Sequence, residues 1–317
     1  MVVGRLAPSP TGAQHLGNAR TFLVAWLSIR AQQGHLLLRI EDIDSPRIKP
    51  WAVDQAIEDL QWLGLDWDEG PDKPLGDRKY IQSERLSLYS HALEELKSKT
   101  RIYPCICSRT DVLEAASAPH EMSDGPVYGG TCRSRPVEEA SRLDSSFAWR
   151  FKSKNEVVSF EDGFRGQLST NVGEALGDFV VYKNNDSPAY QLSVVVDDHE
   201  MNVTEVLRGD DLIQSTFRQN ALYDFWGWAS PRFVHVPLVV GTDGRRLAKR
   251  HGDTRLSYFR DRGVCPERII GLLAHSLGWL EHPVECEPRE LIEKFDLKRI
   301  PPEPFVVGPE EVKWLES

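Results

Sequence analysis

RLAPSPTG, residues 5–12, and HLGNAR, residues 15–20, form the stretch that decides the fold. Residues 2–6, which overlap its start and are mostly apolar, predict a short buried strand. From Gly17 onward the apolar residues fall at helical spacing, so a helix is expected after the turn. In doubly wound sheets, ligands bind beyond the carboxyl ends of the strands. We therefore expect a binding site at this turn.

The rest of the chain predicts a sheet that is interrupted by an insertion. A second buried strand and two helices follow the first unit, which is the alternation of a parallel α/β sheet. The alternation stops near residue 101 and resumes near residue 189. The expected elements are strands at 36–40, 147–151, 157–160, 179–182 and 233–240, helices at 53–60, 86–96 and from about Asp211, an apolar run at 192–196, and a helical tail from Thr254.

These patterns predict an α/β fold with three parts. A Rossmann-like parallel-sheet catalytic domain is expected to be split between residues 1–100 and 189–253. Residues 101–188 are expected to form an inserted α+β subdomain, and residues 254–317 a short helical region. The insertion would then separate two halves of one sheet.

Composition and charge exclude several classes of protein. Of the 317 residues, 40% are hydrophobic, and 38 Lys and Arg against 48 Asp and Glu give a net charge of −10. This balance argues against a general binder of nucleic acids or anionic membranes. Residues 245–262 nevertheless hold seven basic residues against two acidic ones, which suits a local RNA contact.

The cellular setting also follows from the sequence. The chain opens without the charged start and apolar run of a secretory signal, and its apolar run at 22–29 is too short to span a bilayer. Five cysteines are few and odd in number, so a disulfide framework is not expected. We expect a reduced, cytoplasmic protein with no membrane partner, and a monomer.

His15, Gly17 and Asn18 stand where the first crossover helix begins. Free backbone N–H groups and the positive end of the helix dipole make that place suited to phosphate. His15 and Asn18 can add side-chain donors, and Gly17 leaves room for a flat base. A lone His-x-Gly would more often be a helix-capping turn in which the histidine has no chemical role.

The longer run resembles the class I aminoacyl-tRNA synthetases, in particular their glutamyl and glutaminyl branch. In that family R-x-A-P-S-P-T-G precedes the adenylate-forming HIGH element, here His15-Leu16-Gly17-Asn18. Residues 246–250, RLAKR, resemble the second signature, the KMSKS loop, which commonly reads KLSKR in this branch. The resemblance implies that His15, Gly17 and Lys249 bind ATP and that Asn18 assists. Ala248 replaces the serine of the signature, so one hydroxyl donor is lost and we expect an effect on the rate.

The same resemblance implies a pocket for L-glutamate. Its residues are Arg5, Leu6, Ala7, Pro8, Ser9, Glu41, Tyr190 and Arg208. The chemistry agrees, because arginines bind carboxylates through paired, charge-assisted hydrogen bonds. Glu41 can hold the α-ammonium group, and Tyr190 can close one wall while offering a hydroxyl. The acidic pair Asp197-Asp198 is expected to belong to the scaffold, not to a metal site.

Three cysteines in the insertion predict a structural zinc ion. Cys105, Cys107 and Cys132 lie in a region with little apolar content, where a metal would supply folding energy. The fourth ligand is open between His120, Tyr128 and water, and spacing favours His120. A paralogous branch of the synthetases carries C-x-C…Y-x-x-x-C, and resemblance to it implies Tyr128 instead.

The length after the second signature bears on the substrate. The 67 residues that follow Arg250 would accommodate a stem-contact region but not an anticodon-binding domain. The paralogous branch has this build, and it uses ATP with Mg²⁺ to activate L-glutamate and transfer it to queuosine at the wobble position of tRNA(Asp). The resemblance implies the same substrates here, namely L-glutamate, ATP and queuosine-containing tRNA(Asp).

Three alternatives compete with that function. The chain could be a truncated glutamyl-tRNA synthetase that charges the 3′ end of tRNA(Glu), a nucleotidyltransferase that makes a small adenylylated product, or a non-catalytic RNA-binding relative. The nucleotidyltransferase explains neither the cysteine cluster nor the segments around Tyr190 and Arg208. Retention of His15 and Lys249 argues against a non-catalytic relative.

Overall fold

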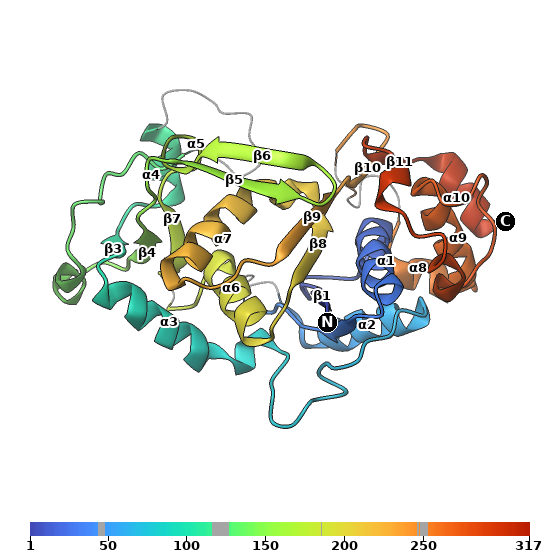
Figure 1. Cartoon of the computed structure of the whole chain (residues 1–317), viewed down its shortest axis with the longest axis horizontal. Helices are drawn as coiled ribbons and strands as arrows, with labels where there is room; N and C mark the ends of the chain where they lie inside the picture. The colour runs from blue at the N-terminus through green and yellow to red at the C-terminus, as the bar shows by residue number, and fades with distance from the viewer. Residues whose placement is uncertain (44–47, 116–126, 185, 246, 248–252) are drawn as a thin grey trace.

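Two pairs of parallel strands form the centre of the fold (Figure 1). The computed structural model describes all residues except 44–47, 116–126, 185, 246 and 248–252. Strand β1 (Val3–Leu6) pairs with β2 (His35–Leu38), and β8 (Glu205–Gly209) pairs with β9 (Arg232–Val236). β1 lies beside β8, where the backbone N–H of Thr204 donates to Val3 O at 2.9 Å. The predicted parallel α/β arrangement is confirmed, although β8 was not among the predicted strands.

Helices bury the apolar faces of the strands. Helix α1 (Leu16–Ala31) packs on β1, β2 and β8, and α2 (Pro50–Trp62) starts at a proline, which lacks the N–H that a first helical turn leaves unpaired. Two helices, α6 (Tyr190–Glu200) and α7 (Ile213–Trp226), pack against each other, and α3 (Leu86–Ser98) packs on α6. The apolar run at 192–196 is thus the buried part of a helix.

The inserted segment contains an antiparallel sheet and a hairpin. Strands β3 (Ile102–Cys105), β4 (Ala148–Phe151) and β7 (Phe179–Tyr182) pair in the order β3-β4-β7. β5 (Val157–Asp162) and β6 (Gly166–Asn171) form the hairpin, and two short helices, α4 (Arg109–Ala115) and α5 (Val172–Ala175), lie in the same segment. The predicted strands β4, β5 and β7 are confirmed. The antiparallel pairing agrees with the α+β architecture expected for the insertion, but β3 and β6 were not predicted.

The strand predicted at 233–240 is wrong, because two strands occupy this region. β9 ends at Val236 and β10 (Val239–Gly241) begins after Pro237, which has no N–H for a strand ladder. The carbonyl of Pro237 instead accepts a hydrogen bond of 2.7 Å from Nη1 of the buried Arg20 on α1. This contact fixes the start of α1 against the turn between the two strands.

The tail contains helices and one strand. Helices α8 (Leu256–Asp261), α9 (Pro266–Ser276) and α10 (Pro309–Glu316) agree with the helical prediction. β11 (Phe305–Val307) was not predicted, and it pairs in parallel with β10. Its three residues are too few to show a strand period. Across the part of the chain that the structure describes, no helix is both long and apolar enough to cross a membrane.

Candidate active site

A cavity of about 540 Å³ lies at the carboxyl ends of β1 and β8, beside the first turn of α1. Most of the residues predicted for the two substrates line it: Arg5, Ala7, Pro8, Ser9, His15, Gly17, Asn18, Glu41, Tyr190 and Arg208. The side chain of Leu6 is fully buried in the core, and its carbonyl accepts the backbone N–H of Arg39 at 2.9 Å. Lys249 and Ala248 lie outside the described residues.

His15 caps helix α1 and also lines the cavity. Its Nδ1 accepts the backbone N–H of Gly17 at 3.1 Å, while Asn18 Oδ1 accepts the backbone N–H of His15 at 3.3 Å. Because Nδ1 is an acceptor, the proton of the neutral ring is on Nε2. A Cβ atom at Gly17 would lie 3.0 Å from Cε1 of His15, so a side chain there would displace the ring. The capping turn and the candidate phosphate site are therefore the same structure.

A short backbone ladder joins this turn to the C-terminal half of the chain. The N–H of Leu16 donates to Thr254 O at 3.0 Å, and the N–H of Leu256 donates to Gln14 O at 2.9 Å. Residues 242–253 follow directly after β10, and Val239 of β10 lines the cavity. The chain therefore leaves from the cavity wall before the KMSKS-like segment and returns beside His15 after it.

Arg208 is buried at one end of the cavity and has several hydrogen-bond acceptors. Its Nη2 donates to Thr216 Oγ1 at 2.7 Å and to Gln219 Oε1 at 2.8 Å, and its Nη1 donates to the Tyr190 hydroxyl at 3.3 Å. Burial raises the pKa of Tyr190, so its hydroxyl stays protonated. A fixed guanidinium beside a neutral hydroxyl is suited to a carboxylate.

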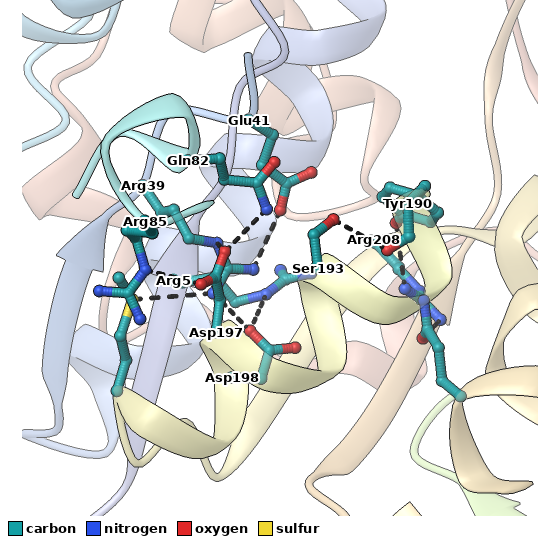
Figure 2. A network of polar contacts seen from close by, with 12 residues as sticks. Arg5, Arg39, Glu41, Gln82, Arg85, Tyr190, Ser193, Asp197, Asp198 and Arg208 are labelled. Carbon is teal, nitrogen blue, oxygen red and sulfur yellow. Dashed lines mark hydrogen bonds and ion pairs between the residues drawn. The ribbon is translucent and has the colours of Figure 1, made fainter. Parts of the chain in front are cut away.

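A buried network of charges includes the cavity-lining residues Arg5 and Glu41 (Figure 2). Arg39 Nη1 donates to Asp198 Oδ1 at 2.7 Å, and Nη2 donates to Glu41 Oε1 at 3.0 Å. Arg5 Nε lies 3.7 Å from Asp198 Oδ1, and Asp197 receives hydrogen bonds of 2.7 Å from both Arg85 and Gln82. The acidic pair at 197–198 is thus bound by arginines, as expected for a scaffold.

Burial has opposite effects on the charged groups of this network. It raises the pKa of Glu41, although Arg39 and Arg5 act in the opposite direction. Burial also lowers the pKa of Arg5. Each group would regain stabilisation of its charged form from a ligand of opposite charge. A zwitterion with an additional carboxylate, such as an acidic amino acid, supplies both charges.

Arg39 is a buried residue of the charge network beside the cavity that sequence reasoning did not identify. Its side chain is fully buried and contacts both Glu41 and Asp198. The signal was present, because an arginine that follows the apolar run Leu36–Leu38 must be paired if the strand is buried. His235 was also missed, and it is likewise a buried polar residue among the apolar residues of strand β9.

The cysteine cluster lies apart from the cavity, at the end of β3. The thiols of Cys105, Cys107 and Cys132 all lie within 4.8 Å of one another, and no other such group of His, Cys, Asp and Glu occurs among the described residues. The Tyr128 hydroxyl is 3.4 Å from Cys105 Sγ and 3.6 Å from Cys107 Sγ. His120 lies outside the described residues.

Comparison of the chain with known protein families agrees with the class of protein that this fold and site indicate. The family model described as "tRNA synthetases class I (E and Q), catalytic domain" matches residues 1–314. The chain therefore belongs to the class I glutamyl- and glutaminyl-tRNA synthetase family, and it is a ligase.

Individual members of this family are similar to the chain over nearly its whole length. A "Glutamyl-Q tRNA(Asp) synthetase" of Rhodopirellula baltica is 50% identical over 324 residues, covering 96% of each chain. A relative of the same name from Symbiobacterium thermophilum is 49% identical, covering 100% of this chain and 99% of its own. The crystal structure of a glutamate tRNA ligase from Elizabethkingia meningosepticum, in complex with its amino acid, has a TM-score of 0.82 at 30% identity. It is matched over 99% of this chain and 68% of that chain.

Proposed function

We propose that this enzyme activates L-glutamate with ATP and transfers it to queuosine at the wobble position of tRNA(Asp). The observation that carries the proposal is a single cavity lined by Arg5, Arg208 and Glu41 at one place and by the His15 turn at another. It brings together donors for carboxylates, an acceptor for an ammonium group and a helix start suited to phosphate. The names of the relatives supply the acceptor.

In this proposal the glutamate is bound at both ends. Arg208 and the Tyr190 hydroxyl bind one carboxylate, while Glu41 accepts the α-ammonium group. Arg5 carries the second positive charge of the pocket, and Ala7, Pro8 and Ser9 form the adjoining wall. The backbone of Leu6 and Pro8 aligns this wall, since their carbonyls accept the N–H groups of Arg39 and Glu41.

The ATP phosphates are placed at the His15 turn. A glutamate carboxylate oxygen bonds to the α-phosphorus of ATP, the bond to the bridging oxygen breaks, and pyrophosphate leaves. Such a step needs positioning and charge stabilisation rather than a strong base. His15, Gly17 and Asn18 supply donors, Lys249 neutralises phosphate charge, and Mg²⁺ accompanies the nucleotide.

Each part of the chain has a different role in this proposal. Residues 1–100 and 189–253 form the catalytic domain, 101–188 the zinc-binding insertion, and 254–317 the region that contacts the RNA stem. In this proposal the enzyme acts on its tRNA in the cytoplasm. The two relatives named glutamyl-Q tRNA(Asp) synthetase match this chain over nearly their full length. This match supports queuosine as the acceptor over the 3′ end of tRNA(Glu).

The activation step is tested by ATP–pyrophosphate exchange. We expect exchange that depends on L-glutamate and is much weaker with L-aspartate, because the shorter side chain cannot reach Arg208 and Glu41 together. Exchange without any amino acid, or with aspartate at the glutamate rate, would contradict the assignment of the cavity.

We also propose one structural zinc ion held by Cys105, Cys107, Cys132 and Tyr128. The distance of 3.7 Å between the sulfurs of Cys107 and Cys132 matches the edge of about 3.8 Å that a tetrahedral site requires. Arg150 Nε lies 3.3 Å from Cys105 Sγ, where it would stabilise the thiolate from outside. When bound, the metal would order this core-poor part of the insertion.

Metal analysis tests the zinc site. The purified protein is expected to hold about one zinc ion per chain, and Cys107→Ser to hold well under half of that. Cys265→Ser is the matched control, because Cys265 lies outside the cluster, at the N-cap position of α9, and its side chain makes no cap hydrogen bond. A metal content near zero in the unaltered protein, or an equal loss in the control, would refute the site.

A further inference from the structure

Two buried side chains outside the cavity are connected to Arg208. His235 on β9 is fully buried, and Asp162 at the end of β5 is 2% exposed. Arg208 Nε lies 3.1 Å from His235 Nε2, and His235 Nδ1 lies 2.7 Å from Asp162 Oδ2. The contacts form a chain from the hairpin of the insertion to the wall of the cavity.

The direction of each hydrogen bond follows from the donors. Arginine Nε can only donate, so His235 Nε2 must accept, and the ring proton is then on Nδ1, where it is donated to Asp162. Burial lowers the pKa of His235, which favours this neutral ring. Asp162 Oδ1 accepts the backbone N–H groups of Phe164 at 3.0 Å and Arg165 at 2.8 Å. The backbone of the hairpin therefore fixes the carboxylate, and the carboxylate fixes the tautomer of the ring.

The same contacts determine which edge of Arg208 is presented to a ligand. A guanidinium has five N–H groups. Nε donates to His235, Nη2 donates to Thr216 and Gln219, and one N–H of Nη1 donates to Tyr190. Among the described residues this leaves one N–H of Nη1, beside the Tyr190 hydroxyl, for a ligand carboxylate.

We propose that His235 and Asp162 are positioning residues of the amino-acid site, which hold the guanidinium of Arg208 in the plane that binds the substrate carboxylate. The inference rests on the proposed function, in which Arg208 binds glutamate. It assigns the β5–β6 hairpin of the insertion a part in amino-acid recognition, although neither Asp162 nor His235 lines the cavity. Displacement of a binding group by about 1 Å can cost on the order of 100-fold in rate.

Two variants of His235 separate positioning from packing. The amide oxygen of His235→Gln falls where Nε2 stands, so it can still accept from Arg208. The amide nitrogen of His235→Asn falls where Nδ1 stands, so it keeps Asp162 but does not reach Arg208. In ATP–pyrophosphate exchange we expect His235→Asn to raise the KM for glutamate on the order of 10- to 100-fold, with the KM for ATP nearly unchanged. His235→Gln is expected to change the KM for glutamate only a few-fold.

Asp162→Asn provides an independent variant of nearly the same size. Its amide oxygen must accept the backbone N–H groups of the hairpin, so its amide N–H group faces His235 Nδ1. The ring proton then moves to Nε2. Nε2 can no longer accept from Arg208 Nε, and two N–H groups face each other. We expect a rise in the KM for glutamate similar to that of His235→Asn.

The outcomes distinguish this inference from the function on which it rests. Equal effects of the two His235 variants, or parallel changes in the KM values for glutamate and ATP, would overturn the positioning role alone. Absence of glutamate-dependent exchange in the unaltered protein would overturn the proposed function, and the inference with it.

Discussion

Arg208→Gln is expected to lower kcat/KM for glutamate in ATP–pyrophosphate exchange on the order of 100-fold or more. The variant removes the positive charge that faces the ligand carboxylate in the proposed complex, and it also leaves Tyr190 and Gln219 without their donor. Loss of one partner of a buried, hydrogen-bonded charge pair costs about 2–5 kcal/mol. About 1.4 kcal/mol corresponds to a factor of ten, so the expected loss is large.

The matched control for Arg208→Gln is Arg289→Gln. Arg289 forms an ion pair with Asp66 at 2.9 Å, but its side chain is 69% exposed and does not line the cavity. We expect this variant to retain the exchange rate of the unaltered protein. If Arg208→Gln had the same kcat/KM for glutamate as the control, the carboxylate would have to bind elsewhere.

Arg39→Met is expected to lower the free energy of unfolding by about 3–5 kcal/mol. Methionine keeps an unbranched apolar stem but lacks the guanidinium, so Glu41, Asp198 and the more distant Asp197 would lose the cation between them. An uncompensated buried charge is much more costly than the loss of a surface pair. Urea unfolding of the two proteins under the same conditions measures the difference.

Two further variants test the cause of that loss. Arg289→Met removes an exposed pair and is expected to cost no more than about 1 kcal/mol. Arg39→Lys retains the charge and is expected to be more stable than Arg39→Met. Equal unfolding free energies for Arg39→Met and Arg289→Met would mean that the buried network does not stabilise the fold.

The elements predicted from sequence are those whose pattern is local. The strand, turn and helix from β1 to α1 were predicted because apolar runs and turn residues stand next to each other. The break at Pro237 could have been predicted, since proline cannot continue a strand ladder. β11 could not, because its pairing with β10 joins residues more than 60 positions apart. The helix α6 is buried over residues 192–198, so its apolar run does not show a helical period.

In the candidate site, too, residues in local motifs were predicted and residues defined by long-range contacts were not. Residues that contact substrate in the proposal stand in recognisable motifs, and the structure brings Arg5, Glu41, Tyr190 and Arg208 to one cavity. The residues that hold them in place do not stand in such motifs. Arg39, Asp162 and His235 come from three different strands or strand ends, and only the tertiary fold brings them into contact with the site. Positioning residues of this kind are defined by long-range contacts.

The most direct test of the central claim is the site of attachment of glutamate on RNA. The protein is incubated with ATP, labelled L-glutamate and tRNA(Asp) that contains or lacks queuosine, and the 3′ end is then trimmed. We predict label that requires queuosine and survives the trimming. Label that appears on tRNA(Glu) and is lost when the 3′ end is removed would contradict the account.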